Sequence, residues 1–324
     1  MKVLVLYNNV LSIDKGETKD LVSAQGVAIA ARAVEEALRP GHDVVCLPVD
    51  FDPSEVLGGY EPEEWVVFNL LEGLGNRADL EPEAVAILGG LGYRYTGSPP
   101  EAMALCLNKA ASKRLLESRG VPTPVYQVCE GPDAEFSVPL PAIVKPVAED
   151  ASLGIDDGAV VRTLEELRDR VRYIVEMYHE PALVEEFIEG REFNIALWGN
   201  GTPECLPLAE IDYSAFPDPL RRICSYAAKW EPERAEYHLT PVTCPANVAS
   251  PLAERIREVA IAAYEAAGCS GYARVDMRER GDQPYVLEIN PNPDISPDAG
   301  FARAALAAGY SYPQMVEKIL AFAA

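Results

Sequence analysis

The chain has 324 residues, the length of two or three ordinary domains, and 48% of them are hydrophobic while 24% are charged. This composition predicts a globular protein with a sizeable core and excludes disordered and collagen-like chains. The 51 acidic and 28 basic residues give a formal net charge of −23. Such a charge repels phosphate backbones and anionic lipid, so we expect no nucleic-acid partner and no membrane partner.

The cysteines and the N-terminus indicate the compartment. The seven cysteines include no C-x-x-C pair, so neither a disulfide framework nor a thiolate zinc site is indicated. The N-terminal run MKVLVLY is too short for a signal-peptide core, and no stretch approaches the roughly 18 apolar residues of a membrane span. These features predict a cytoplasmic protein. The widely spaced His42, His179 and His238 give no metal cluster.

Short apolar strands alternate with amphipathic helices in the first third of the chain. The patterns predict strands at 2–7, 43–49 and 65–71, helices at 21–38 and 81–91, and a short YRYTG strand. The run WVVFNLL of the third strand is apolar except for Asn69, as in the buried strands of parallel sheets. This β-α-β order predicts an open α/β domain, which we place at residues 1–107.

Two further units follow. A helix over 108–119, ended by a glycine and two prolines, opens a small α+β unit at 108–189, with strands at 142–146, 159–161 and 182–188 and a helix at 164–177. The last unit, 190–324, contains a strand pair near 191–211 and an irregular stretch at 213–247. A helix with Ser250 as N-cap, a hairpin and two C-terminal helices then follow. The predicted fold class is therefore α/β to α+β.

The hairpin has the clearest chemistry. Its strands, YARVDM and YVLEIN, are joined by a turn that contains Gly-Asp. Pairing about a centre at residue 282 places Asp276 opposite Glu288, and Arg274 opposite Asn290. Like charges across a strand pair are destabilising, and a divalent cation would reverse that effect. Two carboxylates and an amide oxygen suit Mg²⁺ held against phosphates. A solvated polar face is the alternative interpretation.

Two other segments fit a nucleotide, though each is weak alone. The strand AIVKP ends in Lys145 and precedes a loop of small residues at 148–158, a pattern able to contact phosphates through an ammonium and backbone N–H groups. The segment 182–193 could pair its backbone with an adenine edge while a carboxylate accepts hydrogen bonds from ribose hydroxyls. The alternatives are a solvated lysine and a charged edge strand that prevents aggregation.

A glycine motif provides a competing signal. Gly73, Gly75 and Ala78 form a G-x-G-x-x-A pattern after a strand, which matches the dinucleotide-binding fingerprint in form. The fingerprint belongs after the first strand, with an acid about 20 residues further on. The sequence has Tyr95-Thr96-Gly97 there. An NAD(P)-dependent oxidoreductase is therefore disfavoured.

Taken together, these motifs resemble the ATP-grasp superfamily and, within it, the D-alanine–D-alanine ligase group. The resemblance covers nearly the whole chain and implies a three-domain ATP-grasp architecture. It implies ATP contacts from Lys109, Lys145, Ser152, Gly154, Glu185, Glu186, Phe187, Ile188, Glu192 and Lys229. It also implies catalytic roles for Arg274 and Lys229, and ligation of two Mg²⁺ ions by Asp276, Glu288 and Asn290.

The resemblance implies a carboxylate–amine ligase. In that family ATP phosphorylates a carboxylate to an acyl phosphate, and an amine then displaces phosphate. Small amino acids or peptides would be the substrates, and a homodimer is possible on the same grounds. Synthesis of D-alanyl-D-alanine itself is the nearest alternative, and an ATP-binding sensor that ligates nothing is an alternative from another class. A sensor would be expected to lose one of the lysines or metal ligands, all of which are present.

The sequence departs from the ligase group where substrates bind. Glu72 stands in place of the family's histidine, Asp294 in place of a glycine, and Ala299 in place of a serine. The N-terminal loop at 8–20 lacks the family's Gly-Gly-x-Ser pattern, which leaves its substrate-binding glutamate unassigned. D-alanine as both substrates is therefore doubtful.

We expect the substrate to contact Glu72, Asn292, Asp294 and Asp298. Unpaired buried carboxylates are costly, and a cationic group on the substrate would relieve that cost. The sequence therefore predicts a substrate with a free ammonium or another basic group. The alternative is that Asp294 and Asp298 cap the helix that starts near Ala299.

Overall fold

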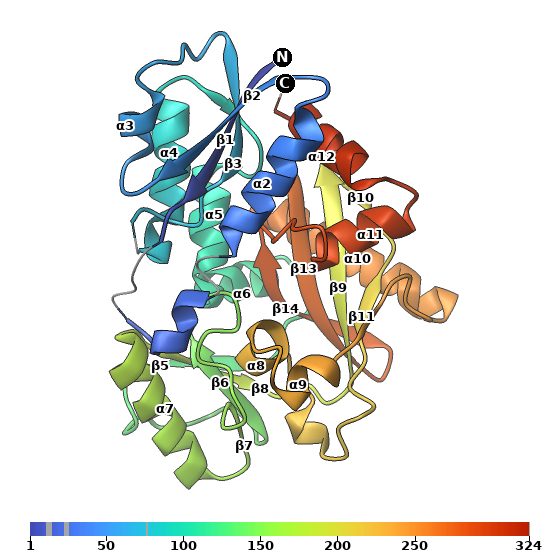
Figure 1. The fold of residues 1–324 in the computed structure, drawn as a ribbon. Coiled ribbons are helices and arrows are strands. Elements are labelled where there is room, and N and C mark those ends of the chain that lie inside the picture. Colours follow the sequence, from blue (N-terminus) through green and yellow to red (C-terminus); the bar gives the residue numbers. More distant parts are fainter. Residues whose placement is uncertain (11–14, 23–25, 76, 324) are drawn as a thin grey trace.

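The computed structural model describes residues 1–10, 15–22, 26–75 and 77–323, which contain three β-sheets (Figure 1). Three predicted segments extend outside these ranges. They are the N-terminal loop, through 11–14, the helix expected over 21–38, through 23–25, and the glycine motif, through residue 76. No helix within the described ranges combines the length and apolar composition that crossing a bilayer requires.

The first sheet is parallel, with strand order β2-β1-β3-β4. Every residue of β3 is buried, including the polar Asn69, as the largely apolar run predicted. Its strands are β1 (Lys2–Asn8), β2 (Asp43–Val49), β3 (Trp65–Leu70) and β4 (Arg94–Tyr95). The same part of the chain forms helices α2 (Val27–Leu38), α3 (Pro53–Leu57) and α4 (Glu81–Gly90), and the 3-10 turns η1 (Thr18–Asp20) and η2 (Ala78–Leu80). The predicted α/β pattern is confirmed here.

The second sheet is antiparallel, with order β5-β8-β6-β7, and packs against α7. Thr163 is the N-cap of α7 and forms a capping box with Glu166, which fixes the start of the helix. The strands of this sheet are β5 (Tyr126–Cys129), β6 (Ala142–Pro146), β7 (Val160–Val161) and β8 (Ala182–Glu186). Helix α7 spans Leu164–Tyr178, and α5 (Pro100–Leu107) and α6 (Lys109–Ser118) precede the sheet in the chain.

The third sheet is the largest and is built around the hairpin. It has the order β12-β11-β9-β13-β14, with β10 also paired to β9. Its strands are β9 (Arg191–Gly199), β10 (Glu204–Cys205), β11 (Ala209–Ile211), β12 (Val242–Thr243), β13 (Gly271–Arg280) and β14 (Gln283–Asn290). Its helices are η3 (Pro219–Arg221), α8 (Tyr226–Trp230), α9 (Ala235–His238), α10 (Ser250–Ala267), α11 (Gly300–Ala307) and α12 (Tyr312–Ala321).

The hairpin pairs Asp276 with Glu288 and Arg274 with Asn290, as predicted. The turn alone does not set these pairs, because Arg280 pairs with Gln283 across it and a bulge that leaves Leu287 unpaired then shifts the register by one residue. The second turn residue, Asp282, has φ +64°, one of the positive values that a tight two-residue turn demands. One prediction nearby is wrong. The N-cap of α10 is Ala249, so Ser250 is the first helical residue and makes no side-chain cap.

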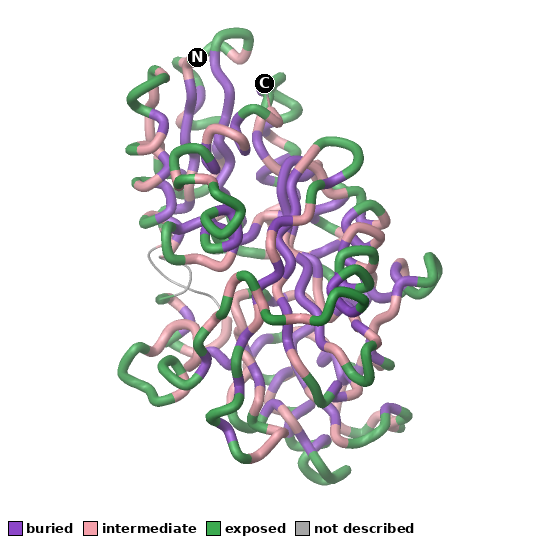
Figure 2. The backbone as a smooth tube through the Cα atoms, turned by 90° about the vertical axis from the view of Figure 1, so that its right-hand side faces the viewer, coloured by how far each residue is buried: buried purple, intermediate pink, exposed green. Residues whose placement is uncertain are grey.

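The two ends of the chain share one hydrophobic core. Val3 and Phe68 of the first sheet belong to the same buried cluster as Trp198 of β9 and Phe301 of α11. The N- and C-termini accordingly lie close together (Figure 1), and the strands beneath are buried along most of their length (Figure 2). This joint core fixes the first sheet against the third, and thereby fixes the residues that follow β3 against those that follow β14.

Removal of the Phe301 ring tests this joint core. Phe301 is 0% exposed, whereas Leu306 on the same helix is 67% exposed. We expect Phe301→Ala to lower the free energy of unfolding by about 3–5 kcal/mol, because it removes buried area and leaves a cavity. Leu306→Ala should change it by about 0.5 kcal/mol or less. Urea denaturation of both variants measures the difference, and equal losses would contradict the assigned core.

Candidate active site

A cavity of ≈ 830 Å³ is lined by residues from all three sheets. This volume is ample for a nucleotide together with a small substrate. The residues named by sequence that line it are Glu72, Lys145, Ser152, Glu185, Glu186, Phe187, Ile188, Glu192, Lys229, Arg274, Asp276, Glu288, Asn290, Asn292, Asp294 and Asp298. Lys109 and Gly154 are not among the lining residues, but Lys109 bonds Asp150, which lines the cavity, and Gly154 stands between Leu153 and Ile155, which also line it. We call this space the central cavity.

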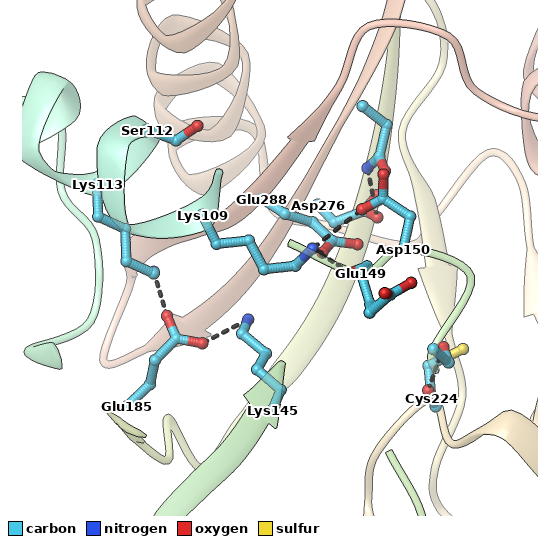
Figure 3. Close-up of polar contacts among 12 residues, drawn as sticks. Lys109, Ser112, Lys113, Lys145, Glu149, Asp150, Glu185, Cys224, Asp276 and Glu288 are labelled. Carbon is cyan, nitrogen blue, oxygen red and sulfur yellow. Dashed lines mark hydrogen bonds and ion pairs between the residues drawn. The ribbon is translucent and has the colours of Figure 1, made fainter. Parts of the chain in front are cut away.

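A buried carboxylate bridges two lysines beside the cavity (Figure 3). Glu185 on β8 pairs with Ile143 on β6, so Lys145, two residues further along, has its side chain on the same face. The Glu185 oxygens form separate ion pairs with Lys113 and Lys145, and both lysines are buried. Burial alone would raise the pKa of Glu185, but the two ammonium groups outweigh it and lower that pKa. The side chain of Glu185 is therefore engaged by lysines.

Lys109 is held at the start of α6. The side chain of its N-cap, Asn108, accepts a hydrogen bond from the backbone N–H of Ala111 (2.9 Å). The Lys109 ammonium bonds the Glu149 carbonyl and Asp150 Oδ1 (3.0 Å), and it lies 3.8 Å from Glu288 Oε2. Burial opposes protonation, yet these carboxylates raise the pKa of Lys109 above its ordinary value. Lys109 therefore remains cationic beside Glu288.

The two carboxylates of the hairpin are offset by protein cations. Both oxygens of Asp276 accept hydrogen bonds from Arg274, at 2.7 Å each, and Asn194 and Asn290 donate to the same carboxylate at 2.7 and 3.1 Å. Burial would raise the pKa of Glu288, but Lys109, other lysines and Arg274 hold it at about 2. The like-charge contact that suggested a metal is thus already offset by Arg274, a role that spacing did not reveal.

The donor chemistry of this hairpin nevertheless fits Mg²⁺. Asp276, Glu288 and Asn290 offer hard oxygen atoms from neighbouring positions on two paired strands. The described residues contain no group of three or more His, Cys, Asp and Glu side chains able to hold a metal alone. Two carboxylates with an amide are the donor set of a cation that completes its coordination with phosphate and water oxygens.

Sequence reasoning missed Arg278, which lines the central cavity and holds the segment from Ile188 to Glu192. Its side chain donates to Glu192 Oε2 (3.0 Å) and to the Ile188 carbonyl (2.9 Å), and it lies 4.7 Å from the Phe187 ring centroid. Tyr213 also donates to Glu192, at 3.1 Å, while burial raises the pKa of that carboxyl. The signal was available, because Arg278 follows Arg274 and Asp276 on one face of β13.

The loop after β6 closes against the segment that carries Lys229. Ser152 has φ +63° and donates to the Cys224 carbonyl (2.9 Å), while Trp230 donates to the Ala151 carbonyl (2.9 Å). Gly154 has φ +69°, and an added Cβ would lie 2.8 Å from the Pro146 side chain. Glycine is thus required there by backbone conformation and by packing.

Acidic side chains also gather in the wall of the central cavity. We call Glu72, Glu81 and Asp294, all of which line it, the acidic end. The Asn292 amide donates to Glu81 (2.9 Å) and to the Leu71 carbonyl, and accepts a hydrogen bond from buried Tyr272 (3.0 Å). Asn292 therefore positions Glu81, which sequence reasoning had not named.

The charge environment of Glu72 is unfavourable. Glu72, Asp294 and Asp298 are exposed residues, so the expectation of buried carboxylates here is wrong. Desolvation by the surrounding walls, followed by the charges of Asp294 and Asp150, nevertheless raises the pKa of Glu72 to about 8. Asp294 accepts a hydrogen bond from the Ser296 amide (2.8 Å), within its own loop. The helix-capping alternative is wrong, because the N-cap of α11 is Ala299 and has no side-chain cap.

A segment of the N-terminal unit also reaches the second sheet's helix. Lys15 forms an ion pair with Glu149, and Tyr173 of α7 donates to Glu17 (3.0 Å). Lys15 lines the central cavity, so this segment forms part of its wall. Sequence reasoning gave no role to it, because the apolar pattern of this loop is weak.

Comparison with known proteins places these features in a family. The model described as "D-ala D-ala ligase C-terminus" matches residues 119–321. The D-alanine–D-alanine ligase of Desulforudis audaxviator is 34% identical over 302 residues, covering 91% of this chain and 92% of that protein. The uncharacterized protein y4sG of Sinorhizobium fredii is 37% identical over 257 residues, covering 79% and 73%.

The fold also matches solved structures. A crystal structure of D-alanine–D-alanine ligase from Bacillus anthracis complexed with ATP superimposes with a TM-score of 0.74 at 20% identity, covering 100% of this chain and 97% of that one. A second structure of the same ligase gives a TM-score of 0.77 at 21% identity, with the same coverage. At these identities the likeness establishes a shared architecture.

The acidic end predicts a pH-dependent stability. Between the ordinary Glu pKa of 4.5 and the raised value of about 8, the folded protein keeps a proton on Glu72 that the unfolded chain has released. The contribution of Glu72 to stability therefore falls as pH rises through this window. Glu72→Gln stays neutral, so its free energy of unfolding should exceed that of the wild type increasingly from about pH 5 to about pH 8.

Urea denaturation across this pH range measures the effect. Glu83→Gln, at an exposed position on α4, is the matched control and should follow the wild-type curve. A constant difference between Glu72→Gln and wild type over the whole range would contradict the raised pKa.

Proposed function

The chain belongs to the D-alanine–D-alanine ligase family of ATP-grasp enzymes and is a ligase that forms C–N bonds; from that premise we propose that it joins an amino acid or small peptide to an amine with ATP. The cations at one cavity carry the proposal. Lys145, Lys229 and Arg274 line it and Lys109 lies beside it, although the chain has a formal net charge of −23. Such a concentration of positive charge suits a triphosphate and a reacting carboxylate.

The proposed reaction has two transfers. A carboxylate oxygen of the first substrate attacks the γ-phosphorus of ATP, and the bond to the β–γ bridging oxygen breaks to release ADP. The amine nitrogen of the second substrate then attacks the acyl carbon, phosphate leaves with the former C–O bonding pair, and the nitrogen loses a proton. Lys145 and Lys229 would offset charge on the nucleotide, and Arg274 charge on the reacting carboxyl.

We propose that Asp276, Glu288 and Asn290 hold Mg²⁺. The ion supplies Lewis-acid neutralisation of phosphate charge when bound. The low pKa of Glu288, about 2, keeps that carboxylate available as an anion at every physiological pH. Asp276 already accepts four hydrogen bonds, so metal binding there requires that it give up at least one of them.

We also propose domain limits of 1–107, 108–189 and 190–324. Each of the three sheets falls within one of these ranges. The central cavity then lies among the three units, with the nucleotide between the second and third and the substrate toward the first. The ATP contacts expected from the segment 185–192 and the loop 148–158 belong to the nucleotide part of the cavity.

For the substrate, we propose an amino acid or peptide with a basic group. The observation that carries this proposal is the acidic end, where the charges acting most strongly on Glu72 are themselves negative. Glu81 likewise has its pKa raised well above the ordinary value by burial and by Asp150 and Glu72. An ammonium or guanidinium group bound there would lower both pKa values and gain charge-assisted hydrogen bonds.

Two other functions remain as alternatives. The relatives named D-alanine–D-alanine ligase favour that activity, for which the acidic end would meet only the α-ammonium group of a D-alanine and no second cation. A sensor that binds ATP without ligation would need no substrate carboxyl beside Arg274. Detection of ADP only when amino acids are present separates a ligase from a sensor.

The metal proposal is tested at Glu288. Glu288→Gln keeps the shape of the side chain but removes its charge, so we expect the fold to persist and turnover to fall by about 100-fold or more at saturating Mg²⁺. Glu258→Gln makes the same change at an exposed position on α10 and should leave turnover unchanged. Wild-type turnover by Glu288→Gln would refute the assignment.

The substrate proposal is tested at Asp294. We expect Asp294→Asn to raise KM for a basic substrate by about 10-fold or more, because a charge-assisted hydrogen bond is lost, while KM for ATP changes by less than about 2-fold. Asp133→Asn, at an exposed position outside the cavity, is the control. Unchanged kinetics in Asp294→Asn, together with a preference for D-alanine over basic amino acids, would favour the ordinary dipeptide ligase.

A further inference from the structure

Lys113 is a fully buried lysine for which the proposed chemistry has no role. Its side chain is 1% exposed and is not among the described residues that line the central cavity. Its ammonium forms an ion pair with Glu185, donates to Thr123 Oγ1 (2.8 Å) and lies 5.8 Å from the Tyr126 ring centroid. Desolvation of an ammonium is costly, so a lysine in this position needs a compensating interaction.

That interaction is a shared carboxylate. Glu185 gives one oxygen to Lys113 and the other to Lys145, which lines the cavity (Figure 3). One carboxylate between two ammonium groups leaves a net charge of about +1 in the trio. A pair of Glu185 and Lys145 alone would be neutral. By sharing Glu185, Lys113 leaves positive charge beside the cavity at the position of Lys145.

The contacts of Lys113 also fix the position of Glu185. Thr123, which accepts from Lys113, itself donates to the Val286 carbonyl of β14 (2.8 Å). The ammonium is therefore connected to α6, to β8 and, through Thr123, to the hairpin strand that carries Glu288. Burial and the charge of Lys145 lower the pKa of Lys113 to about 8, although Glu185 and Glu288 act in the opposite direction. Lys113 is therefore mostly protonated at neutral pH.

We propose that Lys113 is a positioning residue for ATP: it shares Glu185 with Lys145, and so keeps the Lys145 ammonium both oriented and electrically available to the nucleotide. This inference rests on the proposed ATP-binding function of the cavity. A purely structural lysine would contribute to stability only. The two roles differ in their effect on ATP affinity.

The test compares Lys113→Met, Lys113→Arg and Arg114→Met by calorimetric titration with ATP and by steady-state kinetics. Arg114 is an exposed neighbour on α6 and serves as the control. We expect Lys113→Met to raise Kd and KM for ATP by about 10-fold, with kcat at saturating ATP within about 3-fold of wild type. Lys113→Arg should recover most of the affinity, because it restores the cation.

A lowered urea midpoint with an unchanged Kd for ATP would show a structural role and overturn the proposal. If Lys113→Met does not fold, Lys113→Gln removes the charge, retains a hydrogen-bond donor for Thr123, and has the same expected Kd.

A double-mutant cycle tests the route through Glu185. If Lys113 acts through Glu185, then in a Glu185→Gln background Lys113→Met should change Kd for ATP by less than about 2-fold. Independent, multiplying effects would overturn the proposal. Lys145→Ala separates failure of this inference from failure of the proposed ATP-binding function. Unchanged ATP binding in Lys145→Ala would refute the ATP assignment itself. Weakened ATP binding in Lys145→Ala, together with normal ATP binding in Lys113→Met, would refute only the role of Lys113.

Discussion

Two anions, a triphosphate and a carboxylate, can react in one cavity only if positive charge is fixed there before they bind. In this protein the fixed charges are themselves held by buried carboxylates. Glu185 holds Lys145, and Asp276 holds Arg274 through two hydrogen bonds of 2.7 Å each. Such pairing orients a cation that would otherwise sample many rotamers, and it offsets the cost of burying it. The fold serves this arrangement by joining three sheets around the cavity.

The cavity combines two groups of charged side chains. Lys145, Lys229, Arg274 and Arg278 line it and Lys109 lies beside it, whereas Glu72, Glu81 and Asp294 form the acidic end. Desolvation and the negative charges of Asp294 and Asp150 raise the pKa of Glu72 to about 8, so the anionic form is disfavoured there. A ligand that is anionic at one end and cationic at the other would lower the free energy of both. An amino acid with a basic group, activated at its carboxyl, has this distribution of charge.

Sequence patterns predicted the pairs Asp276–Glu288 and Arg274–Asn290 by centring the hairpin on residue 282, whereas the two-residue turn alone would place Leu287 opposite Asp276. A bulge at Leu287 produces the predicted pairs, and the alternation of the strands did not reveal it. Sequence patterns also located the lysine at the end of β6. They could not show that Glu185 binds Lys113, because the two residues are far apart in the chain and only the packing of α6 on β8 brings them together. The N-cap of α10 was displaced by one residue, since serine and the proline after it suit either of two adjacent positions. Sequence patterns placed Asn292 among the substrate contacts, and it lines the cavity, but they could not show that its amide bonds Glu81, Leu71 and Tyr272.

Phosphate release from ATP across a panel of amino acids, with the masses of the products, tests the account most directly. The account predicts that release requires Mg²⁺ and a basic amino acid or peptide, and that the product mass is the sum of the two substrates less one water. Release with D-alanine alone, and none with basic substrates, would contradict the proposed role of the acidic end. Binding of ATP with no ADP formed from any pair would contradict the ligase itself.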